Sequence, residues 1–252
     1  MIKFFGIFIA VAAFISPARA EILTFCYDPY PPYTLGTEGA PSGGIKVDIL
    51  EAIAERLDGV TVEITLLPWQ RCQAQTEAGV YDGILPLFQN DARRKYLTFS
   101  DPVLDQTSSL WFRASPLPVG VEWSGQYEDI AHLRLGMLNG SFINHAMEAA
   151  FTEGGGIFRA RDTVSLFRML ERGRVDFVAI DDSVARYQLA ELGLNAQVRQ
   201  LLPVIATAPA YFGLSKRTGA DTRYLAAFNT ILGELTRSGV IDDILNDPAY
   251  QD

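Results

Sequence analysis

The sequence predicts an α/β protein made of two similar lobes, because one order of elements occurs twice. A helix that ends at Gly79 is followed by an aspartate and by a buried strand over 83–85. The same order returns with a helix that ends at Gly173, a second aspartate and a strand over 177–180. Glycine suits the left-handed residue that closes a helix. Short apolar strands between helices are typical of parallel sheets covered on both faces. Two copies therefore indicate two lobes rather than one sheet.

The composition of the chain excludes several classes of function. Its 252 residues are enough for one large domain or two small ones with their own cores. The formal net charge of −9 argues against binding to nucleic acid or to anionic membranes. Two cysteines and two separated histidines show no metal-ligand spacing. We expect no metal and no cofactor, and a monomeric protein.

The first 20 residues are typical of a secretory signal peptide. Lys3 precedes an apolar run over 4–15, and Ala18-Arg19-Ala20 is a cleavage pattern. The apolar run is too short to span a bilayer, and no later run approaches that length. We expect a mature chain that starts at Glu21, does not insert into the membrane and, in a double-membraned bacterium, works in the periplasm.

The first lobe is expected to open with a strand, a loop rich in proline and tyrosine, and an amphipathic helix. Apolar residues fall on one stripe of this helix, and Asp48 is a suitable N-cap for it. The elements expected before Gly79 are strands over 22–26 and 61–66 and helices over 48–57 and 69–78.

Residues 79–103 carry the most informative motif. After the strand over 83–85 comes a polar loop with Arg93 and Arg94, and Phe99-Ser100-Asp101-Pro102 then leads into a second strand. This run resembles the family 3 periplasmic solute-binding proteins, the receptors of polar amino-acid ABC importers. The resemblance covers nearly the whole exported chain, from about Leu23 to about Ile244. The family places an arginine six residues before the F-S-x-P motif, where it binds the ligand carboxylate.

The resemblance assigns the carboxylate-binding role to Arg93. A guanidinium suits this role because its rigid fork donates two parallel hydrogen bonds and does not deprotonate. A slip of one residue in the loop would exchange Arg93 for Arg94.

The resemblance also implies a periplasmic-binding-protein-like fold of type II, with two α/β lobes, mostly parallel sheets and a hinge of two segments. Lobe 1 would be discontinuous, and the last helix would pack back on it. The implied boundaries are 21–108 plus 212–252 for lobe 1, 109–211 for lobe 2, and about 106–112 and 206–212 for the hinge.

The remaining elements follow from apolar patterning. Gly154-Gly155-Gly156 lacks the residues that complete a nucleotide loop, so we interpret it as a flexible turn. The expected elements are strands over 108–112, 133–138, 177–180 and 207–214, a loop over 116–127, helices over 142–151, 163–172 and 221–237, and a short turn over 241–245.

In the resembling family, aromatic side chains from two places sandwich the ligand. Asp28 and Tyr30 follow the first strand here, and Trp69 opens a later helix. Tyr33 is expected to cover the lobe edge instead. Aromatic faces hold flat or cationic groups well.

Two residues depart from the family pattern. Gln89 lies in a bulky stretch where the family often has a small hydroxyl residue, which argues against an ordinary α-amino acid as ligand. Arg71 is a cation where many members have none. It could pair with Asp82 or another acid, or point into the cleft and favour a second carboxylate on the ligand.

Lobe 2 is expected to contribute an anion site and an acid. Gly140, Ser141 and the start of the helix over 142–151 would present free amides to the carboxylate. In the family an acid after the strand over 177–180 takes the ligand ammonium, which corresponds here to Asp181, with Asp182 as the alternative.

Cys26 ends the first strand and Cys72 lies in the first turn of a later helix. Both belong to the exported part, where disulfides persist. In the implied fold both places border the ligand cleft, so a Cys26–Cys72 bond would join two parts of its wall. Two free buried thiols are the alternative.

We therefore expect a receptor that closes on a small ligand bearing a carboxylate and then docks on a membrane ABC permease. Two alternatives remain open. One is an accessory or sensory binding protein without an importer. The other is a periplasmic dehydratase on the same fold, with Asp181 or Glu171 as general acid.

Overall fold

The computed structural model describes residues 20–114 and 123–250. Most of the expected signal peptide (1–19), part of the expected loop (115–122) and residues 251–252 lie outside the described residues. Within the described residues, no helix combines the length and apolar character needed to cross a bilayer.

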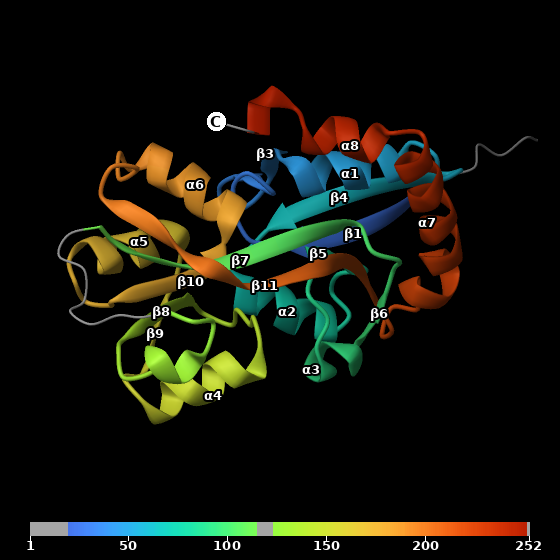
Figure 1. The fold of residues 1–252 in the computed structure, drawn as a ribbon. Coiled ribbons are helices and arrows are strands. Elements are labelled where there is room, and N and C mark those ends of the chain that lie inside the picture. The colour runs from blue at the N-terminus through green and yellow to red at the C-terminus, as the bar shows by residue number, and fades with distance from the viewer. Residues whose placement is uncertain (1–19, 115–122, 251–252) are drawn as a thin grey trace, which may run out of the picture.

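Lobe 1 is built on parallel strands covered by helices (Figure 1). Strand β1 (Glu21–Tyr27) lies between β4 (Val60–Leu66) and β5 (Gly83–Leu87) and pairs in parallel with both. The helices of this lobe are α1 (Ile45–Ala54), α2 (Trp69–Glu77), the short α3 (Asp91–Arg94), α7 (Ala220–Arg237) and α8 (Val240–Leu245).

Lobe 2 repeats this arrangement in a smaller form. Strand β8 (Leu135–Leu138) pairs in parallel with β9 (Ile157–Ala160) and with β10 (Phe177–Asp181). Its helices are α4 (His145–Glu153), α5 (Thr163–Glu171) and α6 (Asp182–Glu191).

Two long strands connect the lobes through the middle of the molecule (Figure 1). Strand β7 (Leu104–Arg113) runs antiparallel to β11 (Val198–Ser215), and the register is interrupted between Leu201 and Ala206. β11 also pairs with β5 and with β6 (Leu97–Phe99), while β7 pairs with β10. The order β4-β1-β5-β11-β7-β10-β8-β9 joins the two expected sheets into one continuous sheet.

The small elements lie at the edges of the lobes. They are the hairpin strands β2 (Leu35–Gly36) and β3 (Pro41–Gly43) and the single turns of 3-10 helix at Tyr127–Asp129 and Pro248–Tyr250.

The last long helix packs against strands of lobe 1. The Phe228 ring of α7 stacks on Phe25 of β1 at 6.0 Å and meets the edge of Phe212 of β11 at 5.6 Å. All three side chains are fully buried. The end of the chain therefore completes the core of lobe 1.

Two helix starts differ from the sequence-based expectation. Helix α1 begins at Ile45, and its N-cap is Gly44 rather than Asp48. Gly44 has φ +124°, and a Cβ there would lie 2.5 Å from the Tyr33 carbonyl oxygen, so only glycine fits. Asp48 lies one turn further on and accepts a hydrogen bond from the Tyr250 hydroxyl (2.6 Å).

Helix α4 begins at His145 rather than at residue 142, because Asn144 caps it through the Met147 amide (2.8 Å).

The triple glycine forms a turn, as expected, but this turn is closely packed rather than open. A Cβ on Gly154 or Gly155 would lie 2.0 or 2.1 Å from the carbonyl oxygens of Ala131 and Leu133. These glycines allow two backbone segments to pack closely. Strand β9 and helix α6 were not expected from the sequence.

Candidate ligand-binding site

A cavity of about 360 Å³ lies between the lobes. Six of the eight expected ligand-binding residues line it, namely Asp28, Tyr30, Trp69, Arg93, Ser141 and Asp181. Much of the remaining lining is apolar and comes from Pro29, Pro68, Leu87, Phe88, Leu138, Phe142, Ile143, Ala179 and Ile180. The cavity therefore combines a few charged groups with a largely apolar wall.

Arg93 lies at the lobe 1 side of the cavity and is 4% exposed. Asn90 caps α3 by accepting from the Arg93 amide (2.8 Å), which fixes the backbone at this residue. The guanidinium donates through Nε to Gln73 (3.2 Å) and through Nη1 to the Phe88 carbonyl oxygen (2.7 Å). Nη2 has no partner among the described residues. Burial lowers the pKa of Arg93 from its usual value, although an arginine keeps its charge at neutral pH.

The other two expected residues do not reach the cavity. Arg71 pairs with Glu38 at 3.5 Å, and both side chains are more than half exposed. Of the two roles considered for Arg71, the structure has the ion pair with an acid, although that acid is not Asp82. Gln89 accepts a hydrogen bond from Arg94 at the surface. Arg94 is thus exposed, whereas its neighbour Arg93 is buried.

Trp69 contacts Arg93 and the other lobe. The Arg93 guanidinium lies 5.2 Å from the centre of the Trp69 ring, within the range of a cation–π interaction. The indole Nε1 donates to the Gly140 carbonyl oxygen of lobe 2 (3.1 Å). Trp69 therefore holds the arginine in place as well as lining the cavity.

Asp181 lies at the start of α6 and accepts four hydrogen bonds. Its Oδ1 accepts from the Ser183 and Val184 amides (2.9 and 3.2 Å), so it is the N-cap of this helix. Its Oδ2 accepts from the Tyr33 hydroxyl (3.2 Å) and from Gln106 Nε2 (3.1 Å). Burial raises the pKa of Asp181. Tyr33 thus does more than cover the lobe edge, because it joins lobe 1 to Asp181.

Asp182 points away from the cavity. Its Oδ2 accepts from Gln200 (2.8 Å) and lies 3.7 Å from Arg186. Of the two adjacent acids, only Asp181 lines the cavity.

The anion site expected at Ser141 does not form as predicted. The Ser141 amide and hydroxyl both donate to the Leu138 carbonyl oxygen (3.2 and 2.8 Å). The following helix starts only at His145, so its first amides are not at Ser141. Ser141 still lines the cavity, but its donors are used in the turn after β8.

Sequence reasoning missed Lys46, which is fully buried behind the cavity wall. Its Nζ donates to the Tyr27 hydroxyl (2.8 Å) and lies 4.4, 5.9 and 4.7 Å from the ring centres of Tyr27, Tyr30 and Tyr33. We call these three rings the tyrosine layer. Within the described residues, no carboxylate lies within 4 Å of this ammonium. Burial lowers the pKa of Lys46 to about 7, against the attraction of Asp181 and Asp28.

One feature of the sequence could have drawn attention to Lys46. It is a charged residue on the apolar side of an amphipathic helix, between Ile45 and Val47, both of which are buried. Its partners come from the tyrosine-rich loop before the helix, which sequence spacing alone does not connect to it.

Asp28 lines the cavity beside these cations. Its carboxyl accepts no hydrogen bond from another residue of the described chain. Burial raises the pKa of Asp28 to about 7, and the charges of Lys46 and Arg93 oppose this shift. Asp28 therefore keeps free hydrogen-bonding capacity at the cavity.

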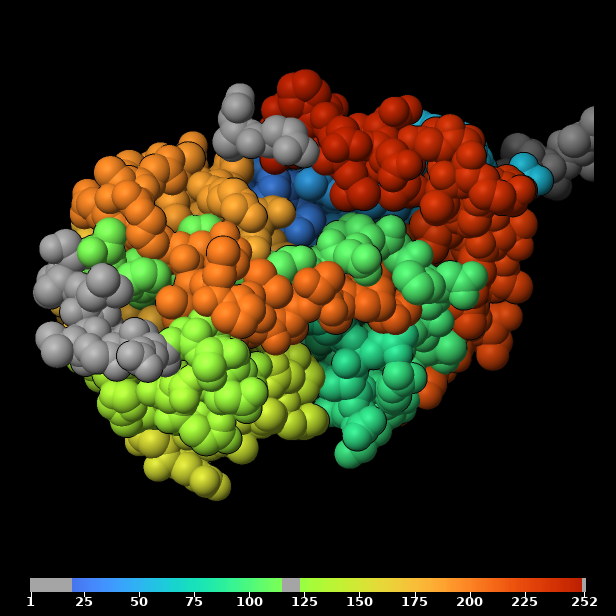
Figure 2. Space-filling model, viewed as in Figure 1, coloured from blue at the N-terminus to red at the C-terminus, as the bar shows by residue number. Residues whose placement is uncertain are grey.

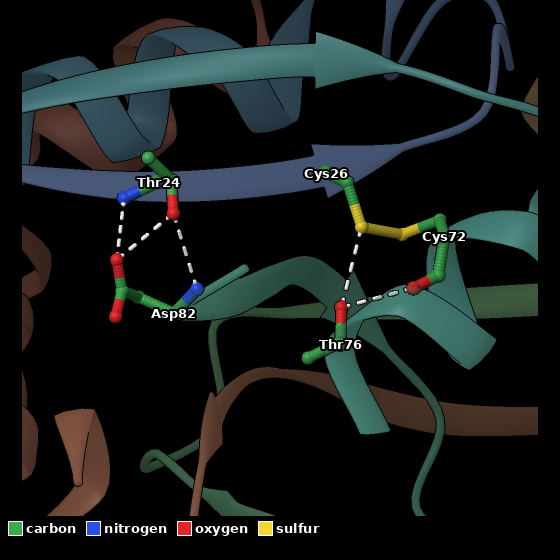
Figure 3. Close-up of a disulfide and its surroundings, with 5 residues drawn as sticks. All are labelled: Thr24, Cys26, Cys72, Thr76 and Asp82. Carbon is green, nitrogen blue, oxygen red and sulfur yellow. Dashed lines mark hydrogen bonds between the residues drawn. A yellow bond between two sulfur atoms is a disulfide. The ribbon is translucent and has the colours of Figure 1, made fainter. Parts of the chain in front are cut away.

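A disulfide joins strand β1 to helix α2 (Figure 3). Cys26 of β1 and Cys72 of α2 are bonded, with an S–S distance of 2.04 Å. Thr76 Oγ1 lies 3.4 Å from Cys26 Sγ and donates to the Cys72 carbonyl oxygen (3.0 Å). The alternative of two free thiols is wrong. The bond fixes the ends of β1 and α2 that carry Tyr27, Asp28 and Trp69.

The sequence matches one family of known proteins. The model of the bacterial extracellular solute-binding proteins, family 3, matches residues 22–247. The chain belongs to this family. Comparison with curated protein sequences finds no match.

Solved structures of this fold class are similar over nearly the whole chain. A mutant of the arginine-binding protein ArgBP from T. maritima is 25% identical, with a TM-score of 0.74 over 90% of this chain and 94% of that one. A histidine kinase sensor domain similar to periplasmic binding proteins is 20% identical, with a TM-score of 0.74 over 91% and 96%.

The ancestral amino-acid-binding protein AncCDT-1, described as a precursor of cyclohexadienyl dehydratase, is 20% identical, with a TM-score of 0.71 over 92% and 96%. The fold therefore occurs in an arginine-binding protein, a sensor domain and a precursor of an enzyme.

Proposed function

We propose that this protein is a periplasmic solute-binding protein that captures a small carboxylate-bearing solute between its lobes and delivers it to an ABC importer. The observation that carries this proposal is the buried Arg93 guanidinium, whose Nη2 has no partner within the described residues and whose side chain lines the cavity between the lobes. An unpaired cation in an enclosed site is costly unless an anion joins it. A ligand carboxylate would supply that anion.

The surroundings of Arg93 support a carboxylate as its partner. Gln73, Phe88 and Trp69 hold the guanidinium from three sides, so little conformational freedom is lost when a ligand binds. A pre-organised fork favours the two parallel hydrogen bonds of an arginine–carboxylate pair.

We further propose that the lobes move about β7 and β11. The proposed boundaries are 21–108 plus 212–252 for lobe 1 and 109–211 for lobe 2, with hinge segments about 106–112 and 206–212. Hinge closure around a ligand excludes water and strengthens the charged contacts inside. Such a protein would act as a monomer in the periplasm after removal of a signal peptide.

Neither of the two acids considered for catalysis, Asp181 and Glu171, is suited to it. Asp181, the expected general acid, already accepts four hydrogen bonds. Glu171, the alternative, pairs with Arg168 at 2.8 Å and does not line the cavity. A general acid must reach the substrate with a proton to give.

The proposal is tested by thermal unfolding of the mature protein with a panel of carboxylates, for wild type, Arg93→Ala and the neighbouring control Arg94→Ala. A ligand present at about 100 times its Kd stabilises by about 2.7 kcal/mol, which raises Tm by about 5–10 °C for a chain of this size. We expect the rise to persist in Arg94→Ala and to disappear in Arg93→Ala.

A rise that survives in Arg93→Ala would remove Arg93 from the site, and no rise with any carboxylate would contradict the proposed ligand class. Delivery to an importer is tested separately by uptake of the labelled ligand in cells with and without the gene. Unchanged uptake would favour the sensory role.

A further inference from the structure

Lys46 is a buried cation that the proposed capture of a carboxylate by Arg93 does not use. Its side chain is 0% exposed, and its ammonium donates only to the Tyr27 hydroxyl among the described residues. Burying an ammonium without a carboxylate partner is costly. A feature that destabilises the fold in this way needs a functional explanation.

The ammonium lies close to the tyrosine layer. Tyr27 and Tyr30 line the cavity, and their ring centres lie 4.4 and 5.9 Å from Lys46 Nζ. A cation binds an aromatic ring through the negative potential of its face. Because Lys46 already uses that potential, the layer attracts a second cation from the cavity only weakly. The two positive charges would also repel each other through one layer of rings.

The acids near the tyrosine layer are also engaged. Asp181 accepts four hydrogen bonds from the protein, which matches the acceptor capacity of a carboxylate. Glu38, a further acid of the cavity wall, pairs with Arg71. Asp28 has free capacity, and it interacts electrostatically with both Lys46 and Arg93. A ligand ammonium placed beside Asp28 would therefore meet two protein cations.

We propose that Lys46 is a specificity-determining residue that makes this cavity select carboxylates without an ammonium or other cationic group. The inference rests on the proposed capture of a carboxylate by Arg93 and names the class of ligand. The body of such a ligand would be apolar or aromatic, because Leu87, Phe88 and Phe142 are among the apolar residues of the cavity wall. Like charges brought together at a binding site cost several kcal/mol, which gives selectivity against the wrong ligand.

The test compares ligands that share a carbon skeleton and differ in one ammonium group. The pairs are 3-phenylpropanoate with L-phenylalanine and 4-methylpentanoate with L-leucine, and L-arginine adds a second cation. Calorimetric titration is done at about pH 6, below the pKa of Lys46 (about 7). Asp28 is also protonated there, since its pKa is about 7, so the Lys46 variants are needed to separate the two effects. We expect each deaminated acid to bind at least about tenfold more tightly than its amino acid, and L-arginine to bind least.

Three variants separate the role of Lys46 from general effects. Lys46→Met and Lys46→Gln remove the buried charge, and both are expected to shift the preference at least about tenfold toward the amino acid. Arg237→Met removes one charge from an exposed position on α7 and should leave the preference unchanged. Using two replacements at Lys46 keeps the test valid if one of them folds poorly.

The outcomes distinguish this inference from the function on which it rests. Tighter binding of the amino acids or of L-arginine to wild type would overturn the role of Lys46 but leave carboxylate capture intact. An unchanged preference for the deaminated acids in both Lys46 variants would also overturn the role of Lys46 and leave carboxylate capture intact. Failure of every carboxylate to bind wild type would overturn the proposed function and this inference together.

Discussion

Arg93 and Arg94 are adjacent in the sequence and have opposite environments. Successive residues of a helix point about 100° apart, so the single turn α3 sends one guanidinium to the cavity and the other to the surface. The Asn90 cap sets where this turn begins. A one-residue change in the start of α3 would exchange the two arginines.

Asp28 predicts a dependence of stability on pH. Its pKa is about 7 in the folded protein and 3.8 in an unfolded reference, so between these values the folded state binds more protons. The contribution of Asp28 to stability therefore falls as pH rises from about 4 to about 7. Asp28→Asn removes this loss. We expect the difference in free energy of unfolding between the variant and wild type to be about 1–3 kcal/mol more in favour of the variant above pH 7 than at pH 4.

Urea unfolding at about pH 4.5 and about pH 8 measures this difference. Asp58→Asn, at an exposed position after α1, is the control and is expected to behave alike at both pH values. An equal effect of Asp28→Asn at the two pH values would show that burial does not perturb this carboxyl.

At the scale of elements, the disulfide connects the first strand to the second helix of lobe 1. β1 ends at Tyr27 and α2 begins at Trp69, and both ends line the cavity. The bond therefore sets the distance between the tyrosine layer and the tryptophan that contacts Arg93.

We expect the double variant Cys26→Ser, Cys72→Ser to unfold more easily. The two cysteines are 46 residues apart, and closing a loop of this length stabilises a fold by about 4 kcal/mol in the chain-entropy model. Urea unfolding of wild type, with and without a reductant, and of the variant measures the loss. Equal midpoints for oxidised wild type and the variant would contradict it.

At the scale of the whole molecule, the two lobes touch on both sides of the cavity. The Trp69 indole donates to Gly140, and the Tyr33 hydroxyl donates to Asp181. In the space-filling view the teal residues of lobe 1 meet the yellow-green residues of lobe 2 below the orange β11 (Figure 2). These contacts join the two lobes.

Gly140→Ala tests whether the contact between Trp69 and Gly140 supports ligand binding. A Cβ at Gly140 would lie 3.0 Å from Gln70 and 3.3 Å from Trp69 across the lobe interface. Gly193→Ala is a matched control, because Gly193 also has positive φ (+67° against +71°) but would meet nothing within 4 Å. Both variants should lose about 1–2 kcal/mol through backbone strain. Only Gly140→Ala should weaken ligand binding, by about three- to tenfold, in calorimetric titration. Equal affinities in the two variants would remove the interface from the binding mechanism.

Much of the fold could be predicted because its causes are local. The apolar runs of β5 and β10 and the glycines that close α2 and α5 are set by neighbouring residues. The predicted helix starts failed at α1 and α4, where the N-cap is Gly44 or Asn144. Gly44 is required by contact with the Tyr33 backbone, which capping preferences do not include.

Some residues of the candidate site could likewise be predicted from the sequence, and others could not. Its members Asp28, Trp69 and Arg93 were predicted from the family resemblance, and they line the cavity. Arg71 was expected either to pair with an acid or to point into the cleft. In the structure it pairs with Glu38. Gln89 was excluded by its contact with the exposed Arg94.

By itself, the sequence determined the two-lobed α/β class, the family motif around Arg93 and the pair of cysteines, since spacing along the chain is enough for each. Only the tertiary structure decided that Lys46 is buried behind the tyrosine layer and that Asp181 is already saturated with donors. The Tyr33–Asp181 contact joins residues 148 positions apart. Burial and hydrogen-bond partners depend on such distant contacts, and the charge that a cavity presents to a ligand depends on both.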